Sequence, residues 1–375
     1  MSEENENVLT EGTADAAAAD TSVDTDSENK TDVPAVPAGN IGAADRLSVY
    51  RVSILWVTLI AVAVRLAALF TSYDSEIGYF NQKNFFPDFF DALLVLMTLF
   101  AVSSVFLFRK QCDMPTSPAF GGGAEFFTEL YAGFIFIADA AYKVYRFVGI
   151  CRSGKIETII DRFKNPKYYQ SPADTTMRVL AILFLMGFIS SVLASVYFLR
   201  GGGGKNKKGQ IGLVYFVIIR CLSGMVQVYF NMEIPMNNPG KLLCELSMIS
   251  VMIYFLAEER FNIGGLRARP NFFIGASLAA FPLCTIAGIT SVVGLLTGVA
   301  PYGEFCVEGV IALVCGLYAF VRLTAYERIV RSPQPAADVT ENVTDTDTET
   351  VSAFGSAETN GNDENDENEE NVSEN

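Results

Sequence analysis

The stretch IGLVYFVIIRCLSGMVQVYF, residues 211–230, decides the fold, because it is apolar for twenty residues apart from one arginine and a few small polar side chains. A bilayer core about 30 Å thick is crossed by roughly 20 apolar residues in a helix that rises about 1.5 Å per residue. A helix satisfies its backbone N–H and C=O groups within its own segment, as hydrocarbon requires. The stretch therefore predicts a transmembrane helix, with its tenth residue, Arg220, near the bilayer midplane.

Six more stretches share this length and apolar character, and an eighth stretch is weaker because four charged residues interrupt it. These runs are continuous, without the alternation of apolar and polar residues that marks the strands of an outer-membrane barrel. The sequence therefore predicts an all-α fold, a polytopic transmembrane helical bundle of about eight spans. The further strong stretches are Val52–Phe70, Phe86–Phe108, Val179–Leu199, Leu242–Ala257, Phe272–Thr297 and Phe305–Leu323, and the weak one is Phe126–Gly149, with Glu129, Asp139, Lys143 and Arg146.

The two ends of the chain are strongly acidic, whereas the body is mildly basic. Residues 1–40 contain ten acidic side chains and one lysine, and residues 332–375 contain thirteen acidic side chains and no basic one. The other 291 residues contain 26 Lys and Arg against 19 Asp and Glu, so the ends carry the net charge of −15. Ends this poor in apolar residues cannot bury enough surface to offset chain entropy. We predict disordered acidic tails at 1–45 and 332–375 around a transmembrane domain at 46–331.

The distribution of Lys and Arg near the ends of the spans predicts the orientation, because cytoplasmic loops are enriched in both. With eight spans and the N-terminus inside, fourteen basic residues lie on the inner side and ten on the outer side. If the weak stretch does not cross, seven spans give thirteen against eleven. Eight spans leave one discordant loop, whereas seven leave three. We therefore predict eight spans, with both termini cytoplasmic.

Ionisable residues inside the spans are the candidates for function. A charge near a helix centre costs about 2.5–3.5 kcal/mol on insertion scales and needs a partner or water. Arg220 is too deep to reach a headgroup easily, and Asp139 lies near the middle of the weak span at a similar depth. We predict that Arg220 and Asp139 form an ion pair across these two helices.

Four other charged residues lie in the outer third of their spans in the eight-span arrangement. Gln227 and Asn231 extend the face of Arg220 outward at i+7 and i+11, with Ser223 between them. This face predicts a polar recess that opens to the outside and ends near Arg220. For Arg65, Asp91 and Glu245, an alternative is that each side chain simply reaches the membrane interface. The four residues are Arg65, Asp91, Glu245 and Glu308.

Several kinds of chemistry are excluded by composition. The chain has no histidine, which rules out HExxH zinc sites and Ser-His catalysis. Its seven cysteines form no CxxC pair, so we expect no metal, no cofactor and no disulfide framework. The triplet Glu258-Glu259-Arg260 is similar to the paired glutamates of prenyl-protein-type membrane proteases, without their histidines. We interpret it as a helix end at the cytoplasmic surface, and an enzyme is the least favoured class.

Three local patterns carry further predictions. Gly294 and Gly298 form a GxxxG pair beside several other small residues, which favours close helix contact within the bundle or between subunits. Residues 155–164 have the spacing of a short amphipathic helix that either lies on the headgroups or caps the bundle. Pro235 and Pro239 enclose two asparagines, and a rigid turn is favoured there over a ligand contact.

Residues 233–241, EIPMNNPGK, lead into a span that ends AEERF at residues 257–261, and residues 73–80, YDSEIGYF, follow the first span. These pieces resemble a pattern in uncharacterised multi-span proteins of clostridial-type Gram-positive bacteria, over about residues 46–330. The resemblance implies a bacterial plasma-membrane protein with all eight spans. It implies no activity, substrate or site.

Two functions are compatible with the sequence. The first is a solute-handling, transporter-like membrane protein with a polar recess around Arg220. An anionic solute would suit Arg220 and Arg65, although the acidic residues equally allow a neutral or cationic one. The second is a structural or interaction protein of the cell envelope, without transport, whose ion pairs fix helix register. The predicted partners are the lipid bilayer, a small solute and a basic protein that binds the acidic tails, with no nucleic acid. For the tails, solvated ends without a partner are the favoured explanation.

Overall fold

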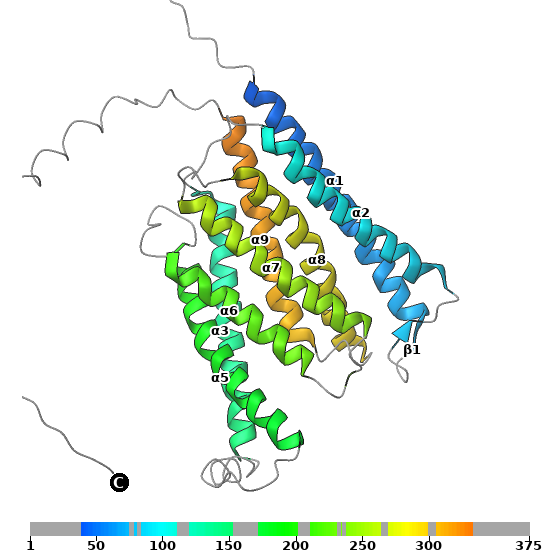
Figure 1. The fold of residues 1–375 in the computed structure, drawn as a ribbon, viewed down its shortest axis with the longest axis vertical. Coiled ribbons are helices and arrows are strands. Elements are labelled where there is room, and N and C mark those ends of the chain that lie inside the picture. The colour runs from blue at the N-terminus through cyan, green and yellow to red at the C-terminus, as the bar shows by residue number, and fades with distance from the viewer. Residues whose placement is uncertain are drawn as a thin grey trace, which may run out of the picture. The chain divides into compact units, whose positions relative to one another are not determined.

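Long helices that run side by side make up almost all of the structure, a computed structural model (Figure 1). The structure describes residues 39–74, 79–80, 84–110, 120–152, 172–201, 211–230, 234, 238–263, 269–298 and 305–332. Over these residues the helices are α1 (Gly39–Thr71), α2 (Phe85–Leu107), α3 (Gly123–Ile150), α5 (Pro172–Leu199), α6 (Ile211–Tyr229), α7 (Pro239–Ile263), α8 (Pro270–Thr297) and α9 (Cys306–Arg331).

Short elements join the first helices. Strands β1 (Tyr73–Asp74) and β2 (Tyr79–Phe80) pair antiparallel between α1 and α2, and the 3₁₀ turn η1 (Phe108–Lys110) follows α2. The predicted amphipathic segment at 155–164 lies outside the described residues, as do nearly all of the predicted tails. Helix α1 begins at Gly39, so helical structure starts before the predicted domain boundary at residue 46.

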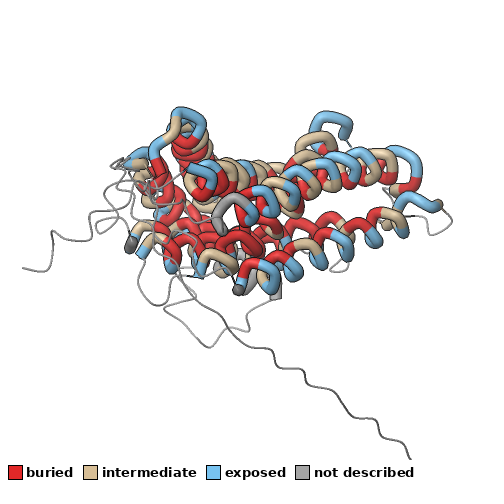
Figure 2. The backbone as a smooth tube through the Cα atoms, turned by 90° about the horizontal axis from the view of Figure 1, so that it is seen from above, coloured by how far each residue is buried: buried red, intermediate tan, exposed pale blue. Residues whose placement is uncertain are grey.

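Seven of the helices are long and apolar enough to cross a membrane, namely all except α3. Their outward faces carry large apolar side chains, among them Trp56, Phe106 and Leu296, which are 62%, 65% and 79% exposed. Buried residues face the interior of the bundle along each helix (Figure 2). A protein in water rarely leaves so much contiguous apolar surface uncovered. The chain is therefore an integral membrane protein of the multi-pass class.

Helix α3 has the length of a span but places its charges inward. Its 28 residues extend about 42 Å at 1.5 Å per residue, enough for the hydrocarbon core. The buried stripe follows the helical spacing of one face, whereas the exposed large side chains are apolar or aromatic. The charges lower the hydropathy of α3 without facing lipid, so we count it as the eighth span. The buried stripe is Glu125, Glu129, Ala132, Gly133, Phe136, Asp139, Ala140 and Lys143, and the exposed face includes Phe126, Phe127, Tyr131, Phe134, Ile137, Tyr145 and Val148.

The start of α1 and the end of α9 lie at the same end of the bundle. Arg331 Nη2 is 3.6 Å from Asp45 Oδ1, and Arg51 Nε is 2.8 Å from Glu327 Oε2. An even number of crossings requires this arrangement, because successive helices must alternate in direction. We call this end of the bundle the terminal end and the opposite end the far end.

Glycines allow α8 and α9 to approach closely. A Cβ atom at Gly288 would lie 2.5 Å from Leu313 Cβ and 2.7 Å from the Gly309 carbonyl oxygen. The GxxxG pattern predicted this contact at Gly294 and Gly298, but Gly298 instead ends α8 in the left-handed region, with φ 70° and open space around it. The close contact is thus within the bundle and is made by other small residues of the same helix.

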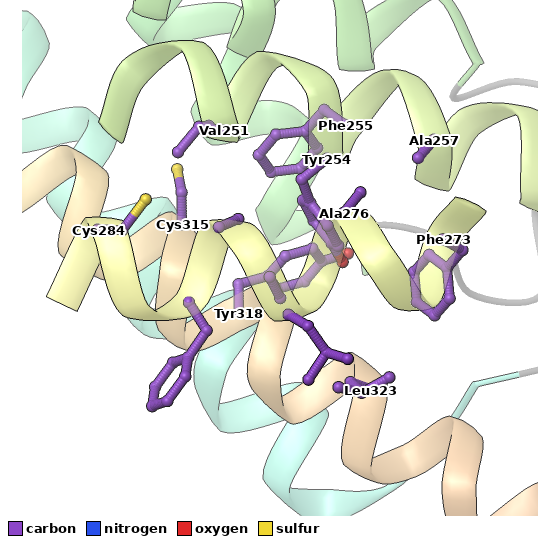
Figure 3. Close-up of a cluster of buried hydrophobic side chains, with 14 of the residues drawn as sticks. Val251, Tyr254, Phe255, Ala257, Phe273, Ala276, Cys284, Cys315, Tyr318 and Leu323 are labelled. Carbon is purple, nitrogen blue, oxygen red and sulfur yellow. The ribbon is translucent and has the colours of Figure 1, made fainter. Parts of the chain in front are cut away.

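Aromatic rings fill the core between α7, α8 and α9 (Figure 3). Phe255 and Tyr318 stack with their ring centroids 5.8 Å apart, and Phe261 stacks on Phe273 at 4.7 Å. Such offset pairs add roughly 0.5–1.5 kcal/mol each beyond the burial of their surface.

Asn238, the residue before α7, caps that helix, whereas residues 235–237 of the predicted turn lie outside the described residues. Asn238 Oδ1 accepts hydrogen bonds from the backbone N–H groups of Gly240, at 2.8 Å, and Lys241, at 3.3 Å. Its Nδ2 donates to the hydroxyl of Tyr73 at 3.3 Å, which ties the start of α7 to strand β1. Asn238 thus satisfies backbone donors that a helix leaves unpaired at its first turn.

Candidate functional site

The deepest charges of the bundle form the ion pair that the sequence predicts. Arg220 of α6 donates from Nε to Asp139 Oδ2 at 2.5 Å and from Nη2 to Asp139 Oδ1 at 2.7 Å. Ser191 of α5 donates its hydroxyl to the same carboxylate at 2.5 Å. Arg220 is fully buried and Asp139 nearly so. This bidentate geometry is the strongest that a guanidinium and a carboxylate can adopt, and it joins α3, α5 and α6.

Lys143 extends the network toward the far end of the bundle. It lies one helical turn beyond Asp139, and its Nζ donates to Gln227 Oε1 and to Glu308 Oε1, both at 2.7 Å. Arg220 Nη2 is 3.5 Å from the same oxygen of Glu308. Two cations therefore face two carboxylates, and the network has no net charge. We call it the Arg220 cluster: Asp139, Lys143, Ser191, Arg220, Gln227 and Glu308.

Polar contacts along α6 connect this cluster to α5. The side chains of Ser223 and Gln227 both donate to the carbonyl oxygen of Leu183, at 2.9 Å and 3.1 Å. Gly187 of α5 faces them, because a Cβ atom there would lie 3.5 Å from Ser223 Oγ and from Gln227 Nε2. The sequence indicated the polar face of α6, but not the backbone carbonyl that it binds.

The recess predicted along this face is closed. Ser223 is 1% exposed and Gln227 is 8% exposed, so the two side chains lie within packed protein and do not line an opening. Asn231, the third residue predicted to line the recess, lies outside the described residues. The prediction that Ser223 and Gln227 share one face with Arg220 is confirmed, that for Asn231 stays a prediction, and the prediction of an open recess is not confirmed.

Of the four residues placed in the outer third, Glu308 alone is brought to Arg220. The Arg65 guanidinium carbon lies 4.3 Å from the ring centroid of Phe80 and 4.5 Å from that of Phe90, which gives it a cation–π environment between α1, α2 and β2. Asp91 is exposed on α2. Glu245 of α7 is partly buried and has Lys241, one turn earlier, as its charged neighbour.

A second buried cluster, missed by the sequence analysis, lies toward the terminal end. Arg322 of α9 donates from Nε to Glu258 Oε1 of α7 at 3.0 Å, and Tyr318 donates its hydroxyl to the same oxygen at 2.9 Å. Glu258 is fully buried. The triplet does lie near the end of α7, with an exposed Arg260 in the last turn, but Glu258 is not at a water-exposed surface. Helix α7 continues to Ile263, and Glu258 faces α9 rather than water.

Two further carboxyls, from α3, face the same arginine. Arg322 Nη1 is 3.8 Å from Glu125 Oε2, and Glu129 follows Glu125 by one helical turn on the buried stripe of α3. The ring of Phe120 covers the guanidinium, whose carbon lies 4.1 Å from the ring centroid. We call this group the Arg322 cluster: Glu125, Glu129, Tyr254, Glu258, Tyr318 and Arg322. Arg322 and Glu258 lie near the ends of their predicted spans, so their burial could not be predicted from position in the span.

The described residues contain no group of three or more Cys, Asp or Glu side chains arranged to hold a metal ion. Cys221, Cys244, Cys284 and Cys315 are buried as free thiols in the core. Both polar clusters consist of ion pairs and hydrogen bonds among side chains of different helices. No family model, curated protein or solved structure matches the chain. Fold and site together define a polytopic integral membrane protein with two separate groups of buried charges.

Proposed function

We propose that this membrane protein is transporter-like and handles a small polar solute at the Arg220 cluster. The observation that supports this most is the burial of two cations and two carboxylates in the middle of the bundle. Replacing buried ion pairs by apolar side chains of similar volume is often neutral or stabilising, so stability alone does not explain them. Ionisable residues at membrane depth commonly serve substrate or ion pathways.

The charge balance of the cluster suggests the class of solute. Because Arg220 and Lys143 are matched by Asp139 and Glu308, a free anion or cation would add an uncompensated charge. A zwitterion or a neutral polar solute would not. The carboxylate of a zwitterion would replace Glu308 beside Lys143, and its ammonium group would replace Lys143 beside Glu308. The sequence leaves anionic, neutral and cationic solutes open, whereas the charge balance of the cluster favours a zwitterionic or neutral one.

The closed network corresponds to an occluded arrangement in this proposal. Movement of α9 away from α3 would open the cluster, because Glu308, the one member of the cluster on α9, is paired with Lys143 of α3. Glu308 is the third residue of α9, near the far end. Opening at the far end would therefore break the contacts of Glu308 before those between Arg220 and Asp139.

A structural function is the second candidate, and one observation favours it. Every charged side chain of the Arg220 cluster has an ion-pair partner within the cluster. Ion pairs between helices can fix the register of those helices without any solute, although Arg220 Nη1 is buried without a hydrogen-bond partner. In that case the protein would be a structural or interaction protein of the cell envelope.

A ligand-stabilisation screen distinguishes the two candidates. Purified protein would be tested against amino-acid zwitterions, neutral sugars and simple anions, with the melting temperature as readout. Transport predicts that a zwitterion or neutral solute raises the melting temperature of wild type and of Arg65→Met, whose arginine lies outside the cluster. The same solute should have no effect on Lys143→Met. If no solute shifts wild type, or if the shift survives Lys143→Met, the Arg220 cluster is not a solute site.

We further propose that the terminal end faces the cytoplasm of a bacterial cell and that the membrane is the plasma membrane. The support is the excess of Lys and Arg that the eight-span arrangement puts on that side, together with the family resemblance of residues 73–80 and 233–261. Both acidic tails would then extend into the cytoplasm, where a basic protein could bind them. Reporter fusions at residue 332 test the orientation, and activity of a periplasmic or extracellular reporter there would contradict it.

A further inference from the structure

The Arg322 cluster carries more acidic than basic groups. Among the described residues, Glu125 and Glu129 of α3 and Glu258 of α7 face one cation, Arg322 of α9. All four side chains are buried, with exposed fractions between 0% and 7%. The other polar groups that face these carboxyls are the hydroxyls of Tyr197 from α5, Tyr254 from α7 and Tyr318 from α9.

The guanidinium of Arg322 cannot neutralise three carboxylates. Its Nε is matched to Glu258, which also accepts the Tyr318 hydroxyl, so Glu258 is the best stabilised as an anion. Glu125 lies in the first turn of α3, where the helix dipole favours a negative charge, and is 3.8 Å from Arg322 Nη1. Glu129 has no hydrogen bond or ion pair to any other described residue, although it shares this neighbourhood.

Unpartnered polar atoms inside the cluster show that its hydrogen bonding is incomplete. Glu125 Oε2 and both Nη atoms of Arg322 are buried without a hydrogen-bond partner. Tyr254 lies one turn before Glu258 on α7, and its hydroxyl interacts with that carboxyl. The side chains of Tyr254 and Tyr318 extend from α7 and α9 into the same part of the core (Figure 3). Leaving such groups unsatisfied costs about 1–3 kcal/mol each, and more when they are charged.

The buried carboxyls of Glu125, Glu129 and Glu258 exceed the one described arginine beside them, and a small positively charged ligand would balance this excess. A metal ion requires several carboxylate oxygens around one point, and the described residues offer no such group. A proton requires one carboxyl only. It also removes the cost of burying the charge, because a carboxyl in an apolar site keeps its proton in preference to ionising.

We propose that the Arg322 cluster is an intramembrane proton-binding site and that the proton resides on the carboxyl of Glu129. Protonation turns Glu129 into a neutral donor and leaves Glu258 as the counter-ion of Arg322. The site lies ten residues from Asp139 along α3, about 15 Å at 1.5 Å per residue. It shares α3 and α9 with the Arg220 cluster, but it does not depend on the solute proposed there.

Infrared spectroscopy of the full-length protein in lipid nanodiscs tests this directly. The C=O stretch of a protonated carboxyl is separate from that of a carboxylate and shifts in deuterated water. At neutral pH we expect wild type to show a band equivalent to one buried carboxylic acid per chain. The band should disappear in Glu129→Gln and should be kept in Glu259→Gln, the matched control on the other side of α7.

Any of the following results overturns the proposal. The site is not a proton site on Glu129 if wild type lacks the band, or if the band is unchanged in Glu129→Gln. A band that disappears on addition of sodium ions at constant pH would assign the site to a metal cation. Failure of Glu129→Gln to fold would also contradict the proposal, because glutamine has the size and neutral charge of the protonated acid. None of these outcomes requires a solute, so they are independent of the ligand screen.

Discussion

The Arg220 cluster and the Arg322 cluster both include residues of α3 and α9, but their buried charges are balanced differently. The Arg220 cluster matches Arg220 and Lys143 with Asp139 and Glu308. The Arg322 cluster surrounds one arginine with three carboxyls. Balance allows every group to stay charged, whereas an excess of acid requires a bound proton. The difference indicates that neutralising one carboxyl destabilises the Arg220 cluster and leaves the stability of the Arg322 cluster nearly unchanged.

The largest effect is expected from breaking the central ion pair. Arg220→Ala or Asp139→Ala leaves the other charge buried and unpaired, which costs about 3–5 kcal/mol. The double variant removes both charges and should recover a large part of this loss. Unfolding in mixed micelles measures the three variants as a double-mutant cycle. Additive losses in the double variant would show that the two residues do not stabilise each other.

Neutralising one acidic side chain in each cluster compares how much each carboxyl contributes to stability. Glu308→Gln removes the ionic partner of Lys143 and should lower the free energy of unfolding by about 1.5–3 kcal/mol, the value of hydrogen bonds to charged groups. Glu129→Gln should leave it nearly unchanged at neutral pH, because the native carboxyl is already neutral. Thermal unfolding of both variants beside wild type gives the result. Equal losses would remove the distinction between the clusters.

Close packing of α9 on α8 supports both clusters, because each has a member on α9. Gly288→Ala would bring a methyl group within 2.7 Å of the Gly309 carbonyl oxygen. Overpacking of this kind costs about 1–3 kcal/mol. Gly42→Ala in α1, where a Cβ atom meets nothing within 4 Å, is the control and should be neutral or slightly stabilising. Comparable losses in both variants would mean that the α8–α9 contact is not especially tight.

The smallest effect is expected far from both clusters, at the start of α7. Asn238→Ala removes the cap of the first turn and should cost about 1 kcal/mol. Asn238→Asp keeps the accepting oxygen and is the matched control. Thermal unfolding would show a loss in the first variant and little change in the second. A larger loss in both would point to the bond with Tyr73 rather than to the cap.

The helices could be predicted closely from the sequence, because lipid imposes length and apolarity on each of them. Residues 86–108 were predicted as a span and α2 covers Phe85–Leu107; residues 179–199 were predicted and form the second part of α5. The pair between Arg220 and Asp139 could be predicted from depth alone. A charge in the middle of a span needs a partner, and few candidates share that depth.

The rest of the site could not be predicted from span positions. Arg322 and Glu258 lie near span ends, where a charged residue ordinarily reaches water, and only the packing of α7 against α9 buries them. Arg65 contacts rings of α2 and β2, and the sequence carries no signal for that contact. The inward face of α3, in contrast, can be predicted from the sequence, because Glu125, Glu129, Asp139 and Lys143 recur at helical spacing.

Both clusters depend on α3 crossing the membrane with its charged face inward. Single cysteines at Gly121 and Arg152, exposed residues at the two ends of α3, would test this in a background with Cys112, Cys151 and Cys306 changed to serine. With an impermeant thiol reagent on sealed vesicles of each orientation, the two cysteines should react from opposite sides. Gly121→Cys should react from the same side as Asp45→Cys. If the cysteines at 121 and 152 react from one side, α3 does not span the membrane.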